Sequence, residues 1–289
     1  MSVPVMRGLR EVADGYDGFV LDLWGVVHDG VTVFPGVIGA LQELRAAGKK
    51  LVFLSNAPRR AHIVAEQLHG FGITAALHDG VMSSGEATWR YLEARPDAWY
   101  RSLGRACLRV GPDRDSGALD GLDLEAVHEV SRADFVLVTG PRDAMTTAEP
   151  YDEMLRAALD RGLPMICANP DREVIRGGIR QICAGAIAER YETMGGDVRW
   201  HGKPDAEIYD GCFEMLGIAD KSRILGIGDS FATDIRGANA AGLDALLVAR
   251  GIHGDDLVGP GGDLDGERIA ARAADAKVEL IGALSEFVW

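Results

Sequence analysis

Five polar residues of this 289-residue chain have types and positions that could serve one reaction together. They are Asp22, Ser55, Lys203, Asp229 and Asp234, and each follows a short apolar run or opens a helix-like stretch. Two carboxylates can hold a Mg2+ ion, which completes its shell with water and substrate phosphate. A lysine adds a point charge, and a serine with nearby backbone N–H groups receives phosphoryl oxygens. The set therefore predicts a Mg2+-assisted reaction at a phosphate group.

Each of these side chains also has an ordinary structural interpretation. A carboxylate such as Asp22 can simply end a strand, and Lys203 can be a solvated lysine. Asp229 and Asp234 can serve as a turn residue and a helix cap, a role for which Thr233 is equally suited. The chemical interpretation gains weight from the combination, because the carboxyl ends of the strands in a doubly wound sheet converge on one edge.

Alternating apolar runs and helix-like segments predict the α/β scaffold that would position these residues. Strands are expected over Gly18–Leu23, Leu51–Leu54, Arg223–Ser230 and Leu243–Val248, and a further strand with its approach is expected over Ile73–Val81. Several of these runs are continuously apolar, which is typical of strands in a parallel sheet that is covered on both faces. We therefore expect a Rossmann-like, doubly wound parallel core.

The long segment between the serine and lysine motifs is assigned to an insert. A capping-box pattern at Ser83-Ser84-Gly85-Glu86 opens it, and strand candidates such as Ala106–Val110 alternate with helical stretches. We expect residues 1–82 and 198–289 to form the Rossmann-like core. Residues 83–197 are expected to form an α/β cap that closes over the site and selects the substrate.

The composition limits the partners. A formal net charge of -14 without a basic cluster argues against nucleic acid and anionic membranes, which require Lys and Arg to neutralise phosphate. No apolar run approaches the roughly 20 residues that span a bilayer, and the N-terminal stretch lacks a signal-peptide core. The four cysteines are scattered, as in reduced proteins. A cytoplasmic protein with a small-molecule substrate is expected, with a homodimer as one option for its assembly.

The order of the motifs resembles that of the haloacid dehalogenase (HAD) superfamily. Four segments carry the resemblance: Asp22-Leu23-Trp24-Gly25-Val26, Leu54-Ser55-Asn56, Gly202-Lys203-Pro204, and Gly228-Asp229-Ser230 with Asp234. The insert resembles the C2-type cap of the NagD-like, class IIA branch, at Ser83-Ser84, Asn169-Pro170-Asp171 and Cys183-Ala184-Gly185-Ala186. The resemblance covers essentially the whole chain and implies a Mg2+-dependent hydrolase of small phosphate monoesters.

The resemblance also implies a role for each matching residue. Asp22 would be the nucleophile that becomes an aspartyl phosphate, and Lys203 would neutralise it. The phosphate-binding residues would be Ser55, Asn56 and Lys203. Apart from the resemblance, the indole of Trp24 can line the substrate pocket or serve only in packing, and Asn169 of the cap can contact the substrate or make a turn. Mg2+ would be bound by Asp22, Asp229 and the backbone carbonyl of Trp24, with Asp234 supporting the metal shell. Such a site fits phosphoryl transfer, which depends chiefly on positioning and charge stabilisation.

The sequence departs from the family at Trp24. Phosphatases of the family carry a second Asp there, which protonates the leaving oxygen, and an indole cannot do so. General acid catalysis, which accelerates such a reaction by roughly 10²- to 10⁴-fold, must come from another group or be absent. His28, Asp29 or the substrate itself are alternative proton sources. Two other functions stay open: a 2-haloacid dehalogenase, which also has an aromatic residue at this position, and a phosphate-binding protein with little turnover.

Overall fold

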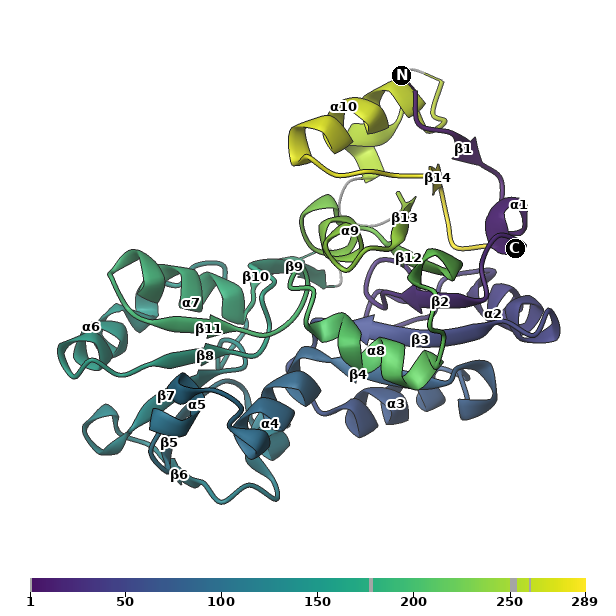
Figure 1. Ribbon diagram of the computed structural model, residues 1–289. Coiled ribbons are helices and arrows are strands. Elements are labelled where there is room, and N and C mark those ends of the chain that lie inside the picture. Colours follow the sequence, from purple (N-terminus) through teal and green to yellow (C-terminus); the bar gives the residue numbers. More distant parts are fainter. Residues whose placement is uncertain (1, 177–178, 250–253, 260) are drawn as a thin grey trace. The chain divides into compact units, whose positions relative to one another are not determined.

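The computed structural model describes residues 2–176, 179–249, 254–259 and 261–289, which form two compact units (Figure 1). The first unit consists of the described residues of Met1–Ser55, Ala65–Met82 and Lys203–Trp289. The second consists of those of Asn56–Val64 and Ser83–Gly202. The chain thus first enters the second unit after Ser55, returns to the first unit at Ala65, enters the second unit again at Ser83 and returns finally at Lys203.

A seven-stranded sheet of order β1-β14-β13-β12-β2-β3-β4 forms the centre of the first unit. Its strands are β1 (Val5–Met6), β2 (Gly18–Leu21), β3 (Lys50–Ser55), β4 (Gly80–Ser83), β12 (Ile224–Gly228), β13 (Asp244–Val248) and β14 (Gly282–Leu284). The pairs from β1 through β14, β13, β12 and β2 to β3 are parallel. The order reverses between β2 and β12, which places a topological switch point at the carboxyl ends of these two strands.

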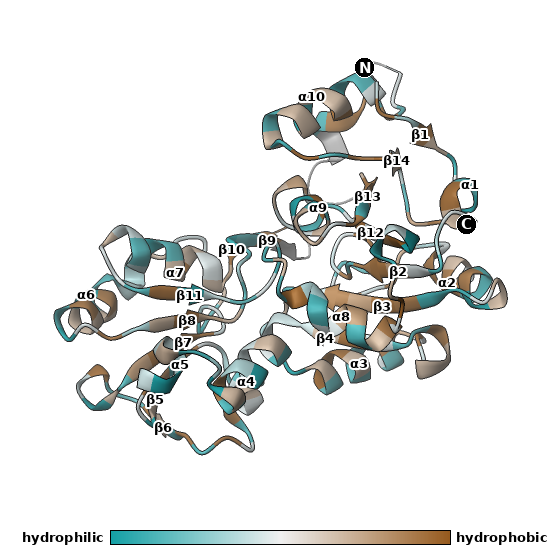
Figure 2. Cartoon of the chain, viewed as in Figure 1, coloured by the Kyte–Doolittle hydropathy of each residue, from teal (hydrophilic) through white to brown (hydrophobic). Residues whose placement is uncertain are grey.

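The sequence explains why these strands lie at the centre. All four residues of β2 and all five of β12 are buried, as are the last five of β3. Strand β3 is accordingly brown in Figure 2, whereas α10 carries hydrophilic patches. Burial on both faces of the sheet favours continuous apolar runs over an alternating pattern.

Helices cover the faces of this sheet. They are α1 (Arg10–Ala13), α2 (Val37–Ala46), α8 (Ile208–Leu216), α9 (Arg236–Ala240), α10 (Gly266–Ala276) and α3 (Ala61–Gly70), which begins in the second unit. Short 3-10 helices lie at Ala75–Leu77, Lys221–Arg223 and Gly254–Leu257, and a π-helical turn at Phe231–Ile235.

The second unit has its own five-stranded parallel sheet, of order β11-β8-β7-β5-β6. Its strands are β5 (Ala106–Val110), β6 (Glu125–Val127), β7 (Phe135–Val138), β8 (Met165–Cys167) and β11 (Val198–Trp200). Strand β6 lies on one side of β5, and β7, β8 and β11 follow in chain order on the other. This sheet therefore has a switch point of its own, between β5 and β7.

The second unit also contains helices and a hairpin. Its helices are α4 (Ser84–Ala94), α5 (Ala98–Ser102), α6 (Asp152–Asp160) and α7 (Ala184–Thr193). The 3-10 helices lie at Asp113–Leu119, Val130–Arg132 and Glu149–Tyr151, and the antiparallel hairpin pairs β9 (Glu173–Arg176) with β10 (Ile179–Ile182).

The predicted fold class is confirmed: both units are built on parallel sheets flanked by helices. Two details differ from expectation. The segment Ile73–Val81, expected to hold a strand and its approach, reaches only into the start of β4, which is preceded by a 3-10 turn in which no residue is buried. In addition, residues 56–64 group with the second unit, because Ala57 and its neighbours pack against the start of α4. None of the helices in the described ranges is both long and apolar enough to cross a membrane.

Candidate active site

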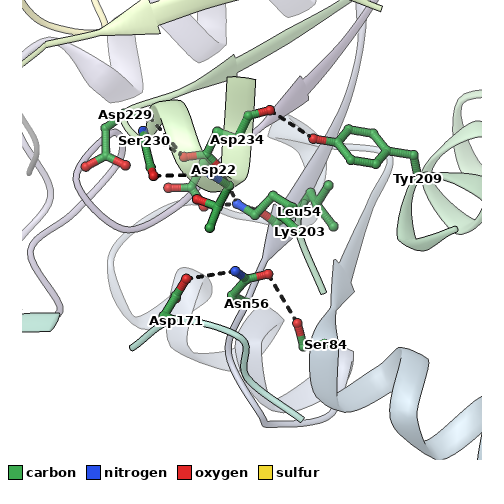
Figure 3. Close-up of polar contacts among 11 residues, drawn as sticks. Asp22, Leu54, Asn56, Ser84, Asp171, Lys203, Tyr209, Asp229, Ser230 and Asp234 are labelled. Carbon is green, nitrogen blue, oxygen red and sulfur yellow. Dashed lines mark hydrogen bonds and ion pairs between the residues drawn. The ribbon is translucent and has the colours of Figure 1, made fainter. Parts of the chain in front are cut away.

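The ammonium of Lys203 lies among the ends of the central strands of the first unit (Figure 3). Its Nζ lies 2.5 Å from Oδ1 of Asp22, the residue that follows β2. It also donates a hydrogen bond of 3.0 Å to the carbonyl of Leu54 in β3. The register of the sheet explains this arrangement. Leu21 pairs with Phe53, so the residues that follow them, Asp22 and Leu54, both reach the lysine.

Lys203 pairs with a second carboxylate as well. Nζ lies 2.5 Å from Oδ1 of Asp234, and the lysine is only 3% exposed. Burial by itself lowers the pKa of the Lys203 ammonium, but the Asp22 and Asp234 carboxylates outweigh it and hold that pKa well above its ordinary value. The lysine therefore stays charged throughout the physiological range.

Asp234 and Asp229 are positioned by the turn that follows β12. Oδ2 of Asp234 accepts hydrogen bonds from the backbone N–H groups of Asp229 (3.2 Å) and Ser230 (3.0 Å). Gly228 is required here, because a Cβ at this position would lie 2.1 Å from Cβ of Asp234. The helix-cap role considered for Asp234 and Thr233 belongs to Ser230, whose hydroxyl accepts from the N–H of Thr233 at 3.3 Å.

Three buried carboxylates gather at the switch point between β2 and β12. Asp22, Asp229 and Asp234 each offer one oxygen, and these oxygens lie within 4.8 Å of one another. With the Lys203 ammonium, the four groups carry three negative charges and one positive charge, a formal sum of -2. Buried charge of this kind needs compensation. An all-oxygen donor set with two excess negative charges fits a hard divalent cation such as Mg2+.

Ser55 is the last residue of β3 and is buried at 8% exposure. Because β3 pairs with β2, Ser55 ends on the same sheet edge as Asp22 and one residue beyond the Leu54 carbonyl that binds Lys203. The structure thus gathers Asp22, Ser55, Lys203, Asp229 and Asp234 at one edge of one sheet, as the spacing of the motifs predicts.

Trp24 is held by the loop that follows β2. Its ring lies edge-on to that of His28 at 5.7 Å between centroids, and a Cβ on Gly30 would come within 2.2 Å of the indole. His28 is 4% exposed, and its Nδ1 accepts the N–H of Gly30 at 3.0 Å. The indole therefore has a packing role in this loop, and one ring nitrogen of His28 is already engaged.

Two further predicted residues belong to the second unit. The side-chain amide of Asn56 donates to Oδ1 of Asp171 at 2.8 Å, and its oxygen accepts from the Ser84 hydroxyl at 3.3 Å (Figure 3). Asn169 is 9% exposed, and its Oδ1 accepts the N–H of Asp171 at 3.0 Å. Asn169 thus shapes the turn that presents Asp171 to Asn56.

Tyr209 of α8 is a site residue that was not predicted from the sequence. Its hydroxyl donates to the backbone carbonyl of Asp234 at 3.3 Å. Burial raises the pKa of the Tyr209 hydroxyl well above its ordinary value, although Lys203 lowers it. An aromatic residue in an apolar helix gives no signal of such a contact in the sequence, since only the tertiary structure brings α8 to this turn.

Comparison with known proteins identifies the family. The family model described as haloacid dehalogenase-like hydrolase matches residues 19–125, and a second, described as HAD-hydrolase-like, matches residues 200–275. A crystal structure of a hydrolase of the haloacid dehalogenase-like family from Brucella suis 1330 is 37% identical in sequence. The match covers 98% of this chain and 100% of that one, with a TM-score of 0.83. The chain belongs to the haloacid dehalogenase-like hydrolases.

Curated relatives of this HAD chain are phosphatases. D-glycerol 3-phosphate phosphatase of Mycobacterium tuberculosis is 29% identical over 85% of the chain, which spans only 66% of that relative. The 5'-nucleotidase YutF of Bacillus subtilis is 26% identical, over 82% of the chain and 88% of the relative. Relatives of this kind confirm the resemblance to the NagD-like, class IIA branch of the HAD family.

Proposed function

We propose that this HAD hydrolase is a Mg2+-dependent phosphatase of small phosphate monoesters that works through an aspartyl phosphate on Asp22. The observation that carries the proposal is the position of the Lys203 ammonium, which lies 2.5 Å from both Asp22 and Asp234. These two residues form a cluster of three carboxylates with Asp229. The names of the curated relatives support the reaction class.

The reaction would proceed in two displacements. A carboxylate oxygen of Asp22 forms a bond to phosphorus while the bond from phosphorus to the ester oxygen breaks, so that the alcohol leaves and takes up a proton. Water then attacks the aspartyl phosphate, which regenerates Asp22 and releases inorganic phosphate. Lys203 stays charged and offsets the negative charge of the transferring group, while Ser55 binds phosphoryl oxygens.

Asp22, Asp229 and the backbone carbonyl of Trp24 would hold the metal, and Asp234 would support them from behind. When bound, Mg2+ supplies positive charge against the phosphoryl oxygens. Asp234 is suited to the supporting role, since one of its oxygens pairs with Lys203 and the other accepts two backbone N–H groups.

The leaving alcohol receives no proton from residue 24, because Trp24 cannot act as an acid. Esters of acidic alcohols, which leave without protonation, are therefore expected to be the best substrates. The lack of an acidic side chain at position 24 favours one alternative, a phosphate-binding protein with little turnover. A 2-haloacid dehalogenase agrees less well with the three gathered carboxylates, since such enzymes do not need a metal ion.

A phosphate-release assay over a panel of metabolite monoesters and p-nitrophenyl phosphate tests the proposal. The wild type should release phosphate with Mg2+, and the activity should disappear with a chelator or with Asp22→Asn. Asp14→Asn, a change at an exposed carboxylate outside these motifs, is the matched control and should retain activity.

Three outcomes would reject this function. Folded wild-type protein that releases no phosphate from any ester contradicts it, and tight binding of phosphate without release would then favour the binding protein. Phosphate release that is unaffected by Asp22→Asn would place the chemistry elsewhere. Release of halide from 2-haloacids in the presence of a chelator would identify a dehalogenase.

A further inference from the structure

Two side chains of one chain segment hold the same residue. Lys203 and Tyr209 lie in the loop that leads into α8 and in α8 itself. The ammonium of Lys203 pairs with Oδ1 of Asp234, whereas the hydroxyl of Tyr209 donates to the backbone carbonyl of Asp234 at 3.3 Å (Figure 3). Asp234 is therefore fixed both at its side chain and at its backbone. All three residues belong to the first unit.

The hydroxyl of Tyr209 is a permanent donor. Tyr209 is 2% exposed, and burial raises the pKa of its hydroxyl well above the ordinary value, although the charge of Lys203 acts in the opposite direction. The hydroxyl therefore keeps its proton throughout the physiological range. A buried carbonyl that loses such a donor is left unsatisfied, and this costs more than the bond itself contributes on balance.

Asp234 lies in a turn of unusual conformation. The segment Phe231–Ile235 is π-helical, and such turns are rare and frequently found at functional sites. A shift of this turn would carry Oδ1 of Asp234 away from the Lys203 ammonium, which also pairs with Asp22. The bond from the Tyr209 hydroxyl to the backbone of the turn opposes such a shift.

A glycine makes room for the ring of Tyr209. Gly237 lies in α9, where an alanine would favour the helix. A Cβ at Gly237 would lie 2.9 Å from Oη and 3.1 Å from Cε2 of Tyr209. The edge of the phenol thus occupies the space of the missing side chain. This close contact between α8 and α9 explains why a glycine is found at this position.

We propose that Tyr209 is a positioning residue of the candidate active site. Its hydroxyl fixes the turn that carries Asp234, and Asp234 in turn holds the Lys203 ammonium beside Asp22. Because this ammonium would offset charge that develops as the phosphoryl group is transferred, its displacement should lower kcat more than it raises KM. The inference rests on the proposed phosphatase function and adds a residue that acts through the ion pair.

A matched pair of tyrosines distinguishes positioning from packing. Tyr191 is fully buried in the second unit, and its hydroxyl donates to the carbonyl of Leu163 at 2.7 Å. Tyr209→Phe should lower kcat for p-nitrophenyl phosphate by about threefold to tenfold, the rate equivalent of one hydrogen bond, with KM changed by less than about twofold. Tyr191→Phe removes the same kind of bond and should lose stability but retain kcat. Equal kcat values in the two folded variants would overturn the inference.

Gly237 provides a second test in which the hydroxyl is retained. Gly237→Ala should push the phenol away from Asp234 and lower kcat, although alanine favours a helix. Gly39→Ala makes the same exchange in α2, where a Cβ would meet no described atom within 4 Å beyond its own turn of helix, and should keep the wild-type kcat. Combining Gly237→Ala with Tyr209→Phe should lower kcat little further, because both changes break one contact. Losses that multiply would contradict a shared contact.

A stability measurement tests the inference without turnover. Tyr209→Phe and Lys203→Met both release Asp234, so the free energy of unfolding lost in the double variant should be smaller than the sum of the two single losses. Tyr191→Phe with Lys203→Met is the control and should be additive. Additive losses for Tyr209→Phe as well would overturn the inference. Should Lys203→Met fail to fold, Asp234→Asn takes its place in this comparison.

The two measurements separate this inference from the proposed function. A wild type that is folded but releases no phosphate rejects the phosphatase, and the coupling between Tyr209→Phe and Lys203→Met then decides the role of Tyr209 alone. An active wild type whose kcat is unaffected by Tyr209→Phe keeps the phosphatase and rejects the positioning role.

Discussion

Lys203 Nζ and Asp234 Oδ1 lie 2.5 Å apart in a buried site, although 31 positions separate the two residues in the chain. The same ammonium pairs with Asp22. Asp234 is thus an electrostatic partner of the lysine, in addition to the metal-supporting role proposed for it. Removal of one partner from such a group leaves charge buried without compensation, which is costly.

Replacement of Lys203 by Met should therefore abolish phosphatase activity and reduce the free energy of unfolding by about 3–5 kcal/mol. Urea denaturation and phosphate release measure the two effects. The double variant Lys203→Met with Asp234→Asn should regain part of the stability but none of the activity, because the like charges are reduced while the site still lacks its ammonium. Additive stability losses in the two variants would contradict the pairing.

Mg2+ should stabilise the folded protein in the absence of substrate. A ligand that binds only the native state at a hundred times its Kd adds about 2.7 kcal/mol to stability, so the melting temperature should rise with MgCl2. Asp229→Asn should greatly reduce this rise, whereas NaCl at equal ionic strength should not produce it. An equal rise in wild type and Asp229→Asn would place the cation elsewhere.

A carboxyl at position 24 should restore proton donation to the leaving alcohol. We expect Trp24→Asp to raise kcat for alkyl phosphates, by up to about 10²-fold, with little gain for p-nitrophenyl phosphate, whose alcohol leaves unaided. The ratio of the two rates measures the effect. Trp24→Asp also removes the packing of the indole against Gly30 and His28. Trp24→Asn is the control for this loss, because it removes the same ring without adding an acid. Equal rates for the Asp and Asn variants would show that protonation does not limit turnover.

The hydrogen bond from Asn56 to Asp171 should position the residue next to Ser55. Asp171→Ala should raise KM for phosphate esters by about tenfold, in line with loss of a hydrogen bond to a charged group. Asp171→Asn keeps an acceptor for the amide of Asn56 and should recover most of the affinity. If both variants lose activity equally, the negative charge of Asp171 matters and not its hydrogen bond.

His201 should make stability fall in acid. Burial, with a smaller contribution from Arg199, lowers the pKa of His201 to about 4 in the folded protein, against about 6.5 in an unfolded chain. Between these values the unfolded chain binds more protons, so the contribution of His201 to stability is lost as the pH falls from about 6.5 towards 4, by up to about 3 kcal/mol. Unfolding of wild type and His201→Gln between pH 4 and pH 7.5 measures the difference in slope; parallel curves would refute it.

Residue patterns predicted the central strands because they are continuous buried runs, and they predicted the gathering of Asp22, Lys203 and Asp229 because strand ends converge. The pairing of Lys203 with Asp234 could not be predicted, since it depends on a π-helical turn that local propensity does not encode.

The boundaries between the two units could not be predicted from the composition either. No change in residue content marks the start of the second unit at Asn56. This start is defined by backbone contacts, such as the hydrogen bond from Gly85 N–H to the carbonyl of Ala57. Gly85 itself permits the approach, because a Cβ there would lie 2.2 Å from the carbonyl oxygen of Pro58.

Ser55 is the last residue before the chain first enters the second unit, and Lys203 is the first after its final return. The number of residues at these two junctions is therefore constrained as strictly as their identity. A single inserted alanine ahead of Lys203 would displace its register by up to about 3.8 Å, more than the 2.5 Å that separates its ammonium from Asp22. Anyone who exchanges the second unit for that of a relative must cut the gene so that neither junction gains or loses a codon.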